Sequence, residues 1–221
     1  MDKAGSALAA CRATVDTLGA TERPSNSMDP DDSLSGSFAN MRLRYLLSTG
    51  DWTGEVAGWG LPKSTGPGAR LDFVFARAMG EIAQDHLAAA REALRELETV
   101  GREVADIETK RGDADPSYRV RPEILLLEAR GLLAEQEKDY AGAEKSLRQA
   151  VALEETLPIA YGPPTVDKPT RELLGEFMLR RDRRNEAHAE FEKALARTPG
   201  RRLAERGFKA TSASVSVGQL P

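Results

Sequence analysis

The chain has 221 residues, of which 40% are hydrophobic and 5% aromatic, and its 31 basic and 35 acidic residues give a net charge of −4. This apolar content is enough for a core, which excludes a wholly disordered chain, and the charge balance gives no sign of a nucleic-acid or membrane partner. Cys11 is the single cysteine, so a disulfide framework and a cysteine-rich zinc site are excluded. We expect a cytoplasmic protein, because neither a run of about 18 apolar residues nor a secretory signal pattern is present.

The first 66 residues are expected to form an N-terminal region with two helices, a degenerate or partial repeat. Apolar residues spaced three or four apart predict a helix over residues 2–18. Serine, proline and aspartate predict a loop over residues 21–36, after which Ser37 is expected to cap a helix over residues 38–47. Seven glycines and prolines in residues 53–69 predict an irregular segment.

Residues 67–210 are predicted to form a helical array, because good helix formers dominate and apolar residues recur with the period of an α-helix. Pro122 and Pro169 are expected to open helices. The predicted helices cover residues 71–83, 85–109, 122–136, 140–153, 169–180, 185–197 and 203–210. The small, polar residues 211–221 are expected to form a disordered tail.

Two helix pairs in this array carry small and large residues at matching positions. A glycine in the first helix opposite an alanine in the second lets the two helices approach closely, and a large apolar residue fills the space beside them. These residues are Gly131, Ala143 and Leu147 in residues 122–155, and Gly175, Ala187 and Phe191 in residues 168–201.

The spacing within both pairs resembles the tetratricopeptide repeat, a helix–turn–helix unit of 34 residues. The chain departs from that pattern at Arg171 and Met178, where the family usually has tryptophan and tyrosine. Ala90 and Leu94 resemble a third, degenerate copy, and the turn at residues 49–52 resembles a relic of a fourth. The proline-rich insertion before the last unit resembles the C-terminal part of longer, poorly characterised bacterial proteins of this family.

The resemblance implies an all-α fold, a tetratricopeptide-repeat-like α-solenoid of stacked antiparallel helical hairpins with irregular Gly/Pro-rich insertions. A solenoid of this kind has a concave groove, and the expected function is a scaffold that binds a protein or peptide there. The groove candidates carried over by position are Glu128, Leu132, Glu135, Gln136, Glu172, Glu176, Leu179 and Arg180. A lid over one edge is expected from Tyr161, Gly162, Pro163 and Pro164. Because four groove candidates are glutamates, a partner segment of basic or mixed character is expected.

Two other functions stay open on the sequence. Because the chain resembles the C-terminal part of longer proteins, one alternative is that it is the scaffold part of a larger enzyme whose catalytic residues lie upstream. Residues 2–18 resemble the second helix of a hairpin without its first, which favours a homodimerisation module as another alternative. We expect no enzymatic activity in the chain itself, and no cofactor.

The residues that suggest chemistry have simpler structural explanations. Lys63 follows several glycines, but Pro62 and Ala57 stand where a phosphate-binding loop needs glycine. His86 and His188 are the only histidines and are expected far apart, so no metal site is predicted. The basic turn at residues 180–184 is expected to be a solvated surface turn. Cys11 is expected to be a core residue, and the tryptophans at 52 and 59 to hold the irregular segment onto the helices.

Overall fold

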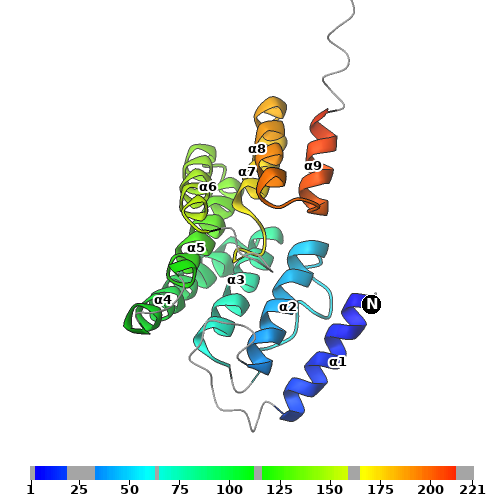
Figure 1. Ribbon diagram of the computed structural model, residues 1–221, viewed down its shortest axis with the longest axis vertical. Coiled ribbons are helices and arrows are strands. Elements are labelled where there is room, and N and C mark those ends of the chain that lie inside the picture. The colour runs from blue at the N-terminus through cyan, green and yellow to red at the C-terminus, as the bar shows by residue number, and fades with distance from the viewer. Residues whose placement is uncertain (1–2, 19–32, 63–64, 112–115, 159–164, 213–221) are drawn as a thin grey trace, which may run out of the picture.

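The computed structural model describes residues 3–18, 33–62, 65–111, 116–158 and 165–212, and the regular structure in these segments is all α-helical. The helices follow one another in space largely in chain order (Figure 1), and most of them pack against the next helix in the sequence. Within the described residues there are nine: α1 (Lys3–Leu18), α2 (Leu34–Thr49), α3 (Pro67–Ala83), α4 (Leu87–Arg111), α5 (Pro116–Gln136), α6 (Tyr140–Glu155), α7 (Thr170–Arg180), α8 (Arg184–Arg197) and α9 (Arg202–Ser212).

The predicted helices are confirmed, but several of their ends were wrong. α2 begins before the predicted Ser37, because Ser33 is its N-cap and the Ser33 Oγ accepts a hydrogen bond of 2.8 Å from the Gly36 N–H. α3 begins at Pro67, inside the segment expected to be irregular. α9 continues through Ser212, so the first two residues of the predicted tail are helical.

Pro122 does not open its helix as predicted but lies inside α5, which begins at Pro116. Proline lacks the N–H that an interior helical position donates, so this placement removes one helical hydrogen bond. The ring is buried against α4, where a β-carbon added to Gly101 would lie 3.2 Å from the Pro122 Cβ. The close contact between α4 and α5 at this glycine gives the proline a packing role inside the helix.

Three helix pairs are joined by turns of the same geometry. The pairs are α3–α4, α5–α6 and α7–α8, and in each turn the residue two before the second helix has a positive φ, at Asp85 (60°), Lys138 (65°) and Asp182 (58°). In each turn, the residue after the one with positive φ donates its N–H to the carbonyl of the residue five positions before it, over 2.8–2.9 Å. Five residues after each positive φ stands a fully buried alanine. These alanines are Ala90, Ala143 and Ala187.

The glycines predicted at close helix contacts are found there. A β-carbon on Gly131 would lie 2.8 Å from Leu147 Cγ, and one on Gly175 would lie 3.0 Å from the Phe191 ring. Leu147 and Phe191 are themselves fully buried. The close approach of the two helices in each pair therefore favours glycine at both positions, because a β-carbon would force Leu147 or the Phe191 ring to shift.

The buried apolar residues form two clusters, one spanning α1 to α6 with the following connection and the other spanning α6 to α9. An ionic network ties the connection before α7 to the first of them. The Arg121 guanidinium on α5 donates to Asp72 on α3 (2.6 Å) and to Asp167 (3.2 Å), and Arg44 on α2 donates to Asp167 (2.7 Å). Arg121 also donates to the Thr165 carbonyl (2.8 Å). The network therefore fixes residues 165–167 against α2, α3 and α5.

Candidate functional site

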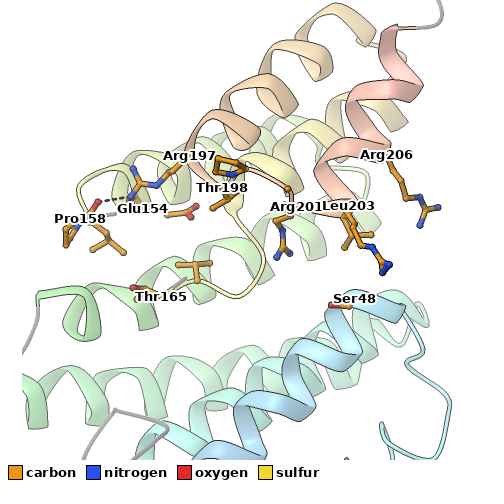
Figure 2. A pocket seen from close by; sticks show the side chains of 14 residues that line it. Ser48, Glu154, Pro158, Thr165, Arg197, Thr198, Arg201, Leu203 and Arg206 are labelled. Carbon is orange, nitrogen blue, oxygen red and sulfur yellow. Dashed lines mark hydrogen bonds between the residues drawn. The ribbon is translucent and has the colours of Figure 1, made fainter. Parts of the chain in front are cut away.

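A pocket of about 820 Å³ lies where the end of α2, the end of α6 and the connection from α8 to α9 meet (Figure 2). α2 contributes Ser48 in its last turn, and the connection before α7 contributes Thr165. The α8–α9 connection turns at Gly200, whose φ of 79° is unfavourable for other residues. This turn brings the first residues of α9 to one wall of the pocket.

The charged residues of the pocket lining are four arginines and one glutamate. They are Arg197, Arg201, Arg202, Arg206 and Glu154. Figure 2 shows Arg201 pointing from the start of α9 toward the space above Ser48, with Arg206 at the outer edge. All four cations come from the end of α8 and the start of α9, within ten residues of sequence. The start of a helix adds partial positive charge to the same wall.

Two of the four arginines are engaged inside the protein. The Arg197 Nη2 donates to the backbone carbonyls of Glu154 (3.1 Å) and Leu157 (2.7 Å). The Arg201 Nε donates to Glu172 Oε2 over 2.7 Å. These bonds hold the pocket wall in shape.

The other two arginines are free to act on a ligand. Arg202 and Arg206 are exposed and form no ion pair with any residue in the described segments. Glu154, the only acid of the lining, is buried and accepts a hydrogen bond of 2.7 Å from the Thr170 N–H. Burial raises the pKa of this carboxyl, and the four arginines outnumber it in the lining. The pocket therefore presents net positive charge to solvent.

The groove glutamates lie on α5 and α7, as expected, but they do not form an open acidic surface. Glu128 and Glu172 are 1% and 0% exposed. Glu128 accepts from the Thr170 hydroxyl (2.6 Å), and Glu172 pairs with Arg201 and with Lys168 (3.7 Å). These two groove candidates therefore offer no exposed carboxylate, because cations and a hydroxyl from other elements cover them.

The remaining groove candidates are also engaged. Glu135 pairs with Arg180 over 2.6 Å, which links α5 to α7. Glu176 pairs with Lys168 (2.8 Å), and Gln136 donates to the Ile82 carbonyl (3.3 Å). Leu132 and Leu179 are half-buried. The predicted lid of Tyr161, Gly162, Pro163 and Pro164 lies outside the described residues.

The basic turn after α7 is neutralised rather than free. The Arg181 guanidinium lies 3.6 Å from the centroid of the Tyr140 ring, and Arg183 donates to Glu186 (2.7 Å) and to Glu144 (2.5 Å). Together with the Arg180–Glu135 pair, these contacts join the turn after α7 to the α5–α6 pair.

The other candidate residues lie apart. His86 contacts Glu81 at the α3–α4 turn, whereas His188 contacts Thr211 on α9. Cys11 is half-buried and packs against the larger core. In the described part of the chain, no three histidine, cysteine, aspartate or glutamate side chains are placed to hold a metal ion. No helix among these residues is long and apolar enough to cross a membrane.

Sequence reasoning missed the arginine-lined pocket. Arg201, Arg202 and Arg206 follow the last predicted helix pair, where the repeat pattern makes no statement. The signal was the local excess of arginine after Pro199. Comparisons of the chain with protein-family models, with curated proteins and with solved structures find no match.

Proposed function

We propose that the protein is a protein-interaction module and that its arginine-lined pocket binds an acidic segment of a partner protein. The observation that carries this proposal is the pair of exposed arginines, Arg202 and Arg206, without a counter-ion in the described residues. They line a pocket of about 820 Å³, which is large enough for several side chains of a peptide.

The helix packing supports an interaction module rather than a different all-α architecture. Three consecutive helix pairs share one turn geometry, and each places a buried alanine five residues after the positive φ. These features agree with the resemblance to tetratricopeptide repeats, whose units stack into peptide-binding arrays. That the three helix pairs are repeats of this family is part of what we propose.

Charge favours an acidic partner over the partner of basic or mixed character expected from the sequence. Glu128 and Glu172 are buried, and Glu135 and Glu176 have cationic partners within 2.8 Å. A basic peptide would have to displace Arg180 and Lys168 to reach these carboxylates. An acidic peptide meets arginines that have no competing partner, and such complementarity raises both specificity and association rate.

The test is a charge reversal with a matched control. The double variant Arg202→Glu and Arg206→Glu is compared with Arg95→Glu and Arg102→Glu, two exposed arginines on α4 that undergo the same change in net charge. Fluorescence anisotropy measures binding of synthetic peptides rich in aspartate and glutamate. We expect the pocket variant to bind at least roughly tenfold more weakly, about 1.4 kcal/mol, and the α4 variant to bind like wild type.

Two results would contradict the proposal. Equal losses in both variants would mean that the peptides respond only to net charge. Wild-type protein that binds no acidic peptide would leave the pocket arginines without this role. Circular dichroism of both variants checks that the helices are retained.

A further inference from the structure

The segment after α2 begins like a second helix of a pair. Gly50 has a φ of 68°, close to the 65° of Lys138 in the α5–α6 turn. The next residue, Asp51, accepts a hydrogen bond of 2.9 Å from the Gly54 N–H, just as Asp139 accepts one of 2.9 Å from the Gly142 N–H at the start of α6. Residues 50–54 therefore match the turn and cap that elsewhere start a helix.

The helix that should follow stops after one turn. The Ala57 and Gly58 N–H groups donate to the Gly54 carbonyl over 3.1 and 3.3 Å, after which Gly60 and Pro62 continue without helical bonds. A glycine or alanine stands seven residues before the positive φ in the three complete pairs, but here the position holds the fully buried Leu43. A leucine at this position leaves less room for a close second helix than a glycine or alanine does.

A cavity of about 360 Å³ lies beside this shortened segment, between it and α3. Trp52, Trp59 and Leu61 line it from the segment, and Phe73 lines it from α3. Both tryptophans of the chain are in this lining. The volume is near the lower end for small-molecule sites, which are about 300–1,000 Å³.

The cavity also contains a buried cation. Arg42 of α2 is 5% exposed, and its guanidinium lies 4.5 Å from the centroid of the Phe73 ring. Its Nε and Nη2 donate to the carbonyls of Val56 (2.9 Å) and Ala57 (2.7 Å), which close the single helical turn. Its Nη1 donates to no group among the described residues, and Arg42 forms no ion pair there.

Other arginines near the cavity have counter-ions. Arg70 pairs with Glu103 over 2.8 Å, and Arg77 pairs with Glu96. Burial and the nearby charge of Arg12 lower the pKa of Arg42 to about 10, so it remains charged at neutral pH. A buried charge without a counter-ion is costly, and an anion in the cavity would offset that cost.

We propose that this cavity binds a small organic acid, with one carboxylate on the Arg42 guanidinium and an apolar body against Trp52 and Trp59. A single guanidinium suits one carboxylate, which accepts two parallel hydrogen bonds. A phosphate would bring more negative charge into a lining that also contains Glu81 and Glu96. A peptide with an apolar C-terminal residue also carries a carboxylate next to an apolar side chain. The test therefore includes such a peptide as a second source of the ligand. This site is independent of the arginine-lined pocket.

Tryptophan fluorescence of the full chain measures binding directly, because both tryptophans line the cavity. The probes are phenylacetate, its neutral analogue phenylacetamide, and a short peptide ending in phenylalanine. We expect saturable binding of phenylacetate and at least roughly tenfold weaker binding of the amide. Tighter binding of the peptide acid than of phenylacetate would assign the site to a chain terminus, and weaker binding would assign it to a free acid.

Variants at the rim avoid disturbing the buried arginine. Leu61 is 44% exposed, so Leu61→Asp and Leu61→Asn should both fold. We expect Leu61→Asp to weaken phenylacetate binding several-fold more than Leu61→Asn does, because both variants lose the same apolar contact and only the aspartate adds charge repulsion. Arg42→Gln should remove the preference for acid over amide. Equal affinity of wild type for acid and amide, or no saturable signal with phenylacetate, would overturn the proposal.

Discussion

Thr170, at the start of α7, bridges two carboxyl groups on two other helices: its hydroxyl donates to Glu128 Oε1 on α5 over 2.6 Å, and its N–H donates to Glu154 Oε2 on α6 over 2.7 Å. Glu128 Oε2 has no hydrogen-bond partner in the described residues, although it is buried. Burial raises the pKa of Glu128 well above its ordinary value, against the opposing effect of the Thr170 hydrogen bond.

The raised pKa predicts that Glu128 makes stability depend on pH. Below the pKa of the unfolded chain this carboxyl is protonated in both states. As the pH rises toward the folded pKa, only the unfolded form ionises, so folding takes up a proton and stability falls. Glu128→Gln removes this loss, and we expect it to stabilise the protein by about 1–3 kcal/mol at alkaline pH and to have little effect near pH 4.

Urea denaturation of wild type and Glu128→Gln across that pH range measures the difference. Glu123→Gln, at an exposed position of the same helix, is the control and should give a difference that does not change with pH. A constant difference for Glu128→Gln would mean that folding does not change the pKa of Glu128.

The close packing of the last helix pair predicts that Ala187 tolerates no larger residue. Ala187 is fully buried opposite α7. Ala187→Leu should destabilise the protein by roughly 1–3 kcal/mol through overpacking. Ala196→Leu, at an exposed position of α8, should leave the melting temperature nearly unchanged. Similar melting temperatures for both variants would place Ala187 away from the helix contact.

The cap of α6 predicts a moderate effect of its aspartate. Asp139 Oδ1 accepts from the Gly142 N–H, one of the helical N–H groups without a partner inside the helix. Asp139→Ala should cost about 1 kcal/mol, whereas Asp139→Asn should retain most of the stability. Thermal unfolding followed by circular dichroism distinguishes the two. A loss of equal size in Asp139→Asn would indicate that charge, rather than the hydrogen bond, stabilises this end.

The ionic network around Arg121 predicts the largest loss. Arg121→Met leaves Asp72 and Asp167 buried, with Arg44 as the remaining cation paired with Asp167 among the described residues, which should cost about 3–5 kcal/mol at neutral pH. The cost should shrink at acid pH, because burial raises the pKa of Asp72 and protonation then removes its charge. Arg70→Met, which breaks an exposed pair, should cost less than about 1 kcal/mol. Equal and small losses would show that the network is not needed for folding.

The helices were predictable because their signals are local. Gly131 and Ala143, or Gly175 and Ala187, stand at fixed spacing along the sequence, and this spacing alone indicates where two helices approach. Pro122 was misplaced for the opposite reason. Its position inside α5 depends on the close contact with Gly101 on α4, and nothing in its own neighbourhood in the sequence reveals that contact.

The candidate sites depended on distant residues and were largely missed. In the sequence, Glu128 and Glu172 look like exposed positions on a helix. In the structure, Glu128 bonds to the Thr170 hydroxyl, 42 residues away, and Glu172 pairs with Arg201, 29 residues away. Arg42 likewise resembles a surface arginine, but the turn at residues 54–58 and the Phe73 ring of α3 enclose it. The sequence shows which residues are charged. Which of these charges have no ion-pair partner depends on the tertiary structure, which the sequence pattern does not reveal.

Sequential packing has a consequence for amide exchange in α9. This helix packs against α8 and α7, and its first turns supply Arg202 and Arg206 to the pocket. A helix held by few neighbours opens locally more readily than one packed on several sides. A ligand of the pocket engages only the closed form, so occupancy should slow amide exchange throughout α9, even at residues far from the ligand. Local opening of α9 is thus coupled to whether the pocket is filled.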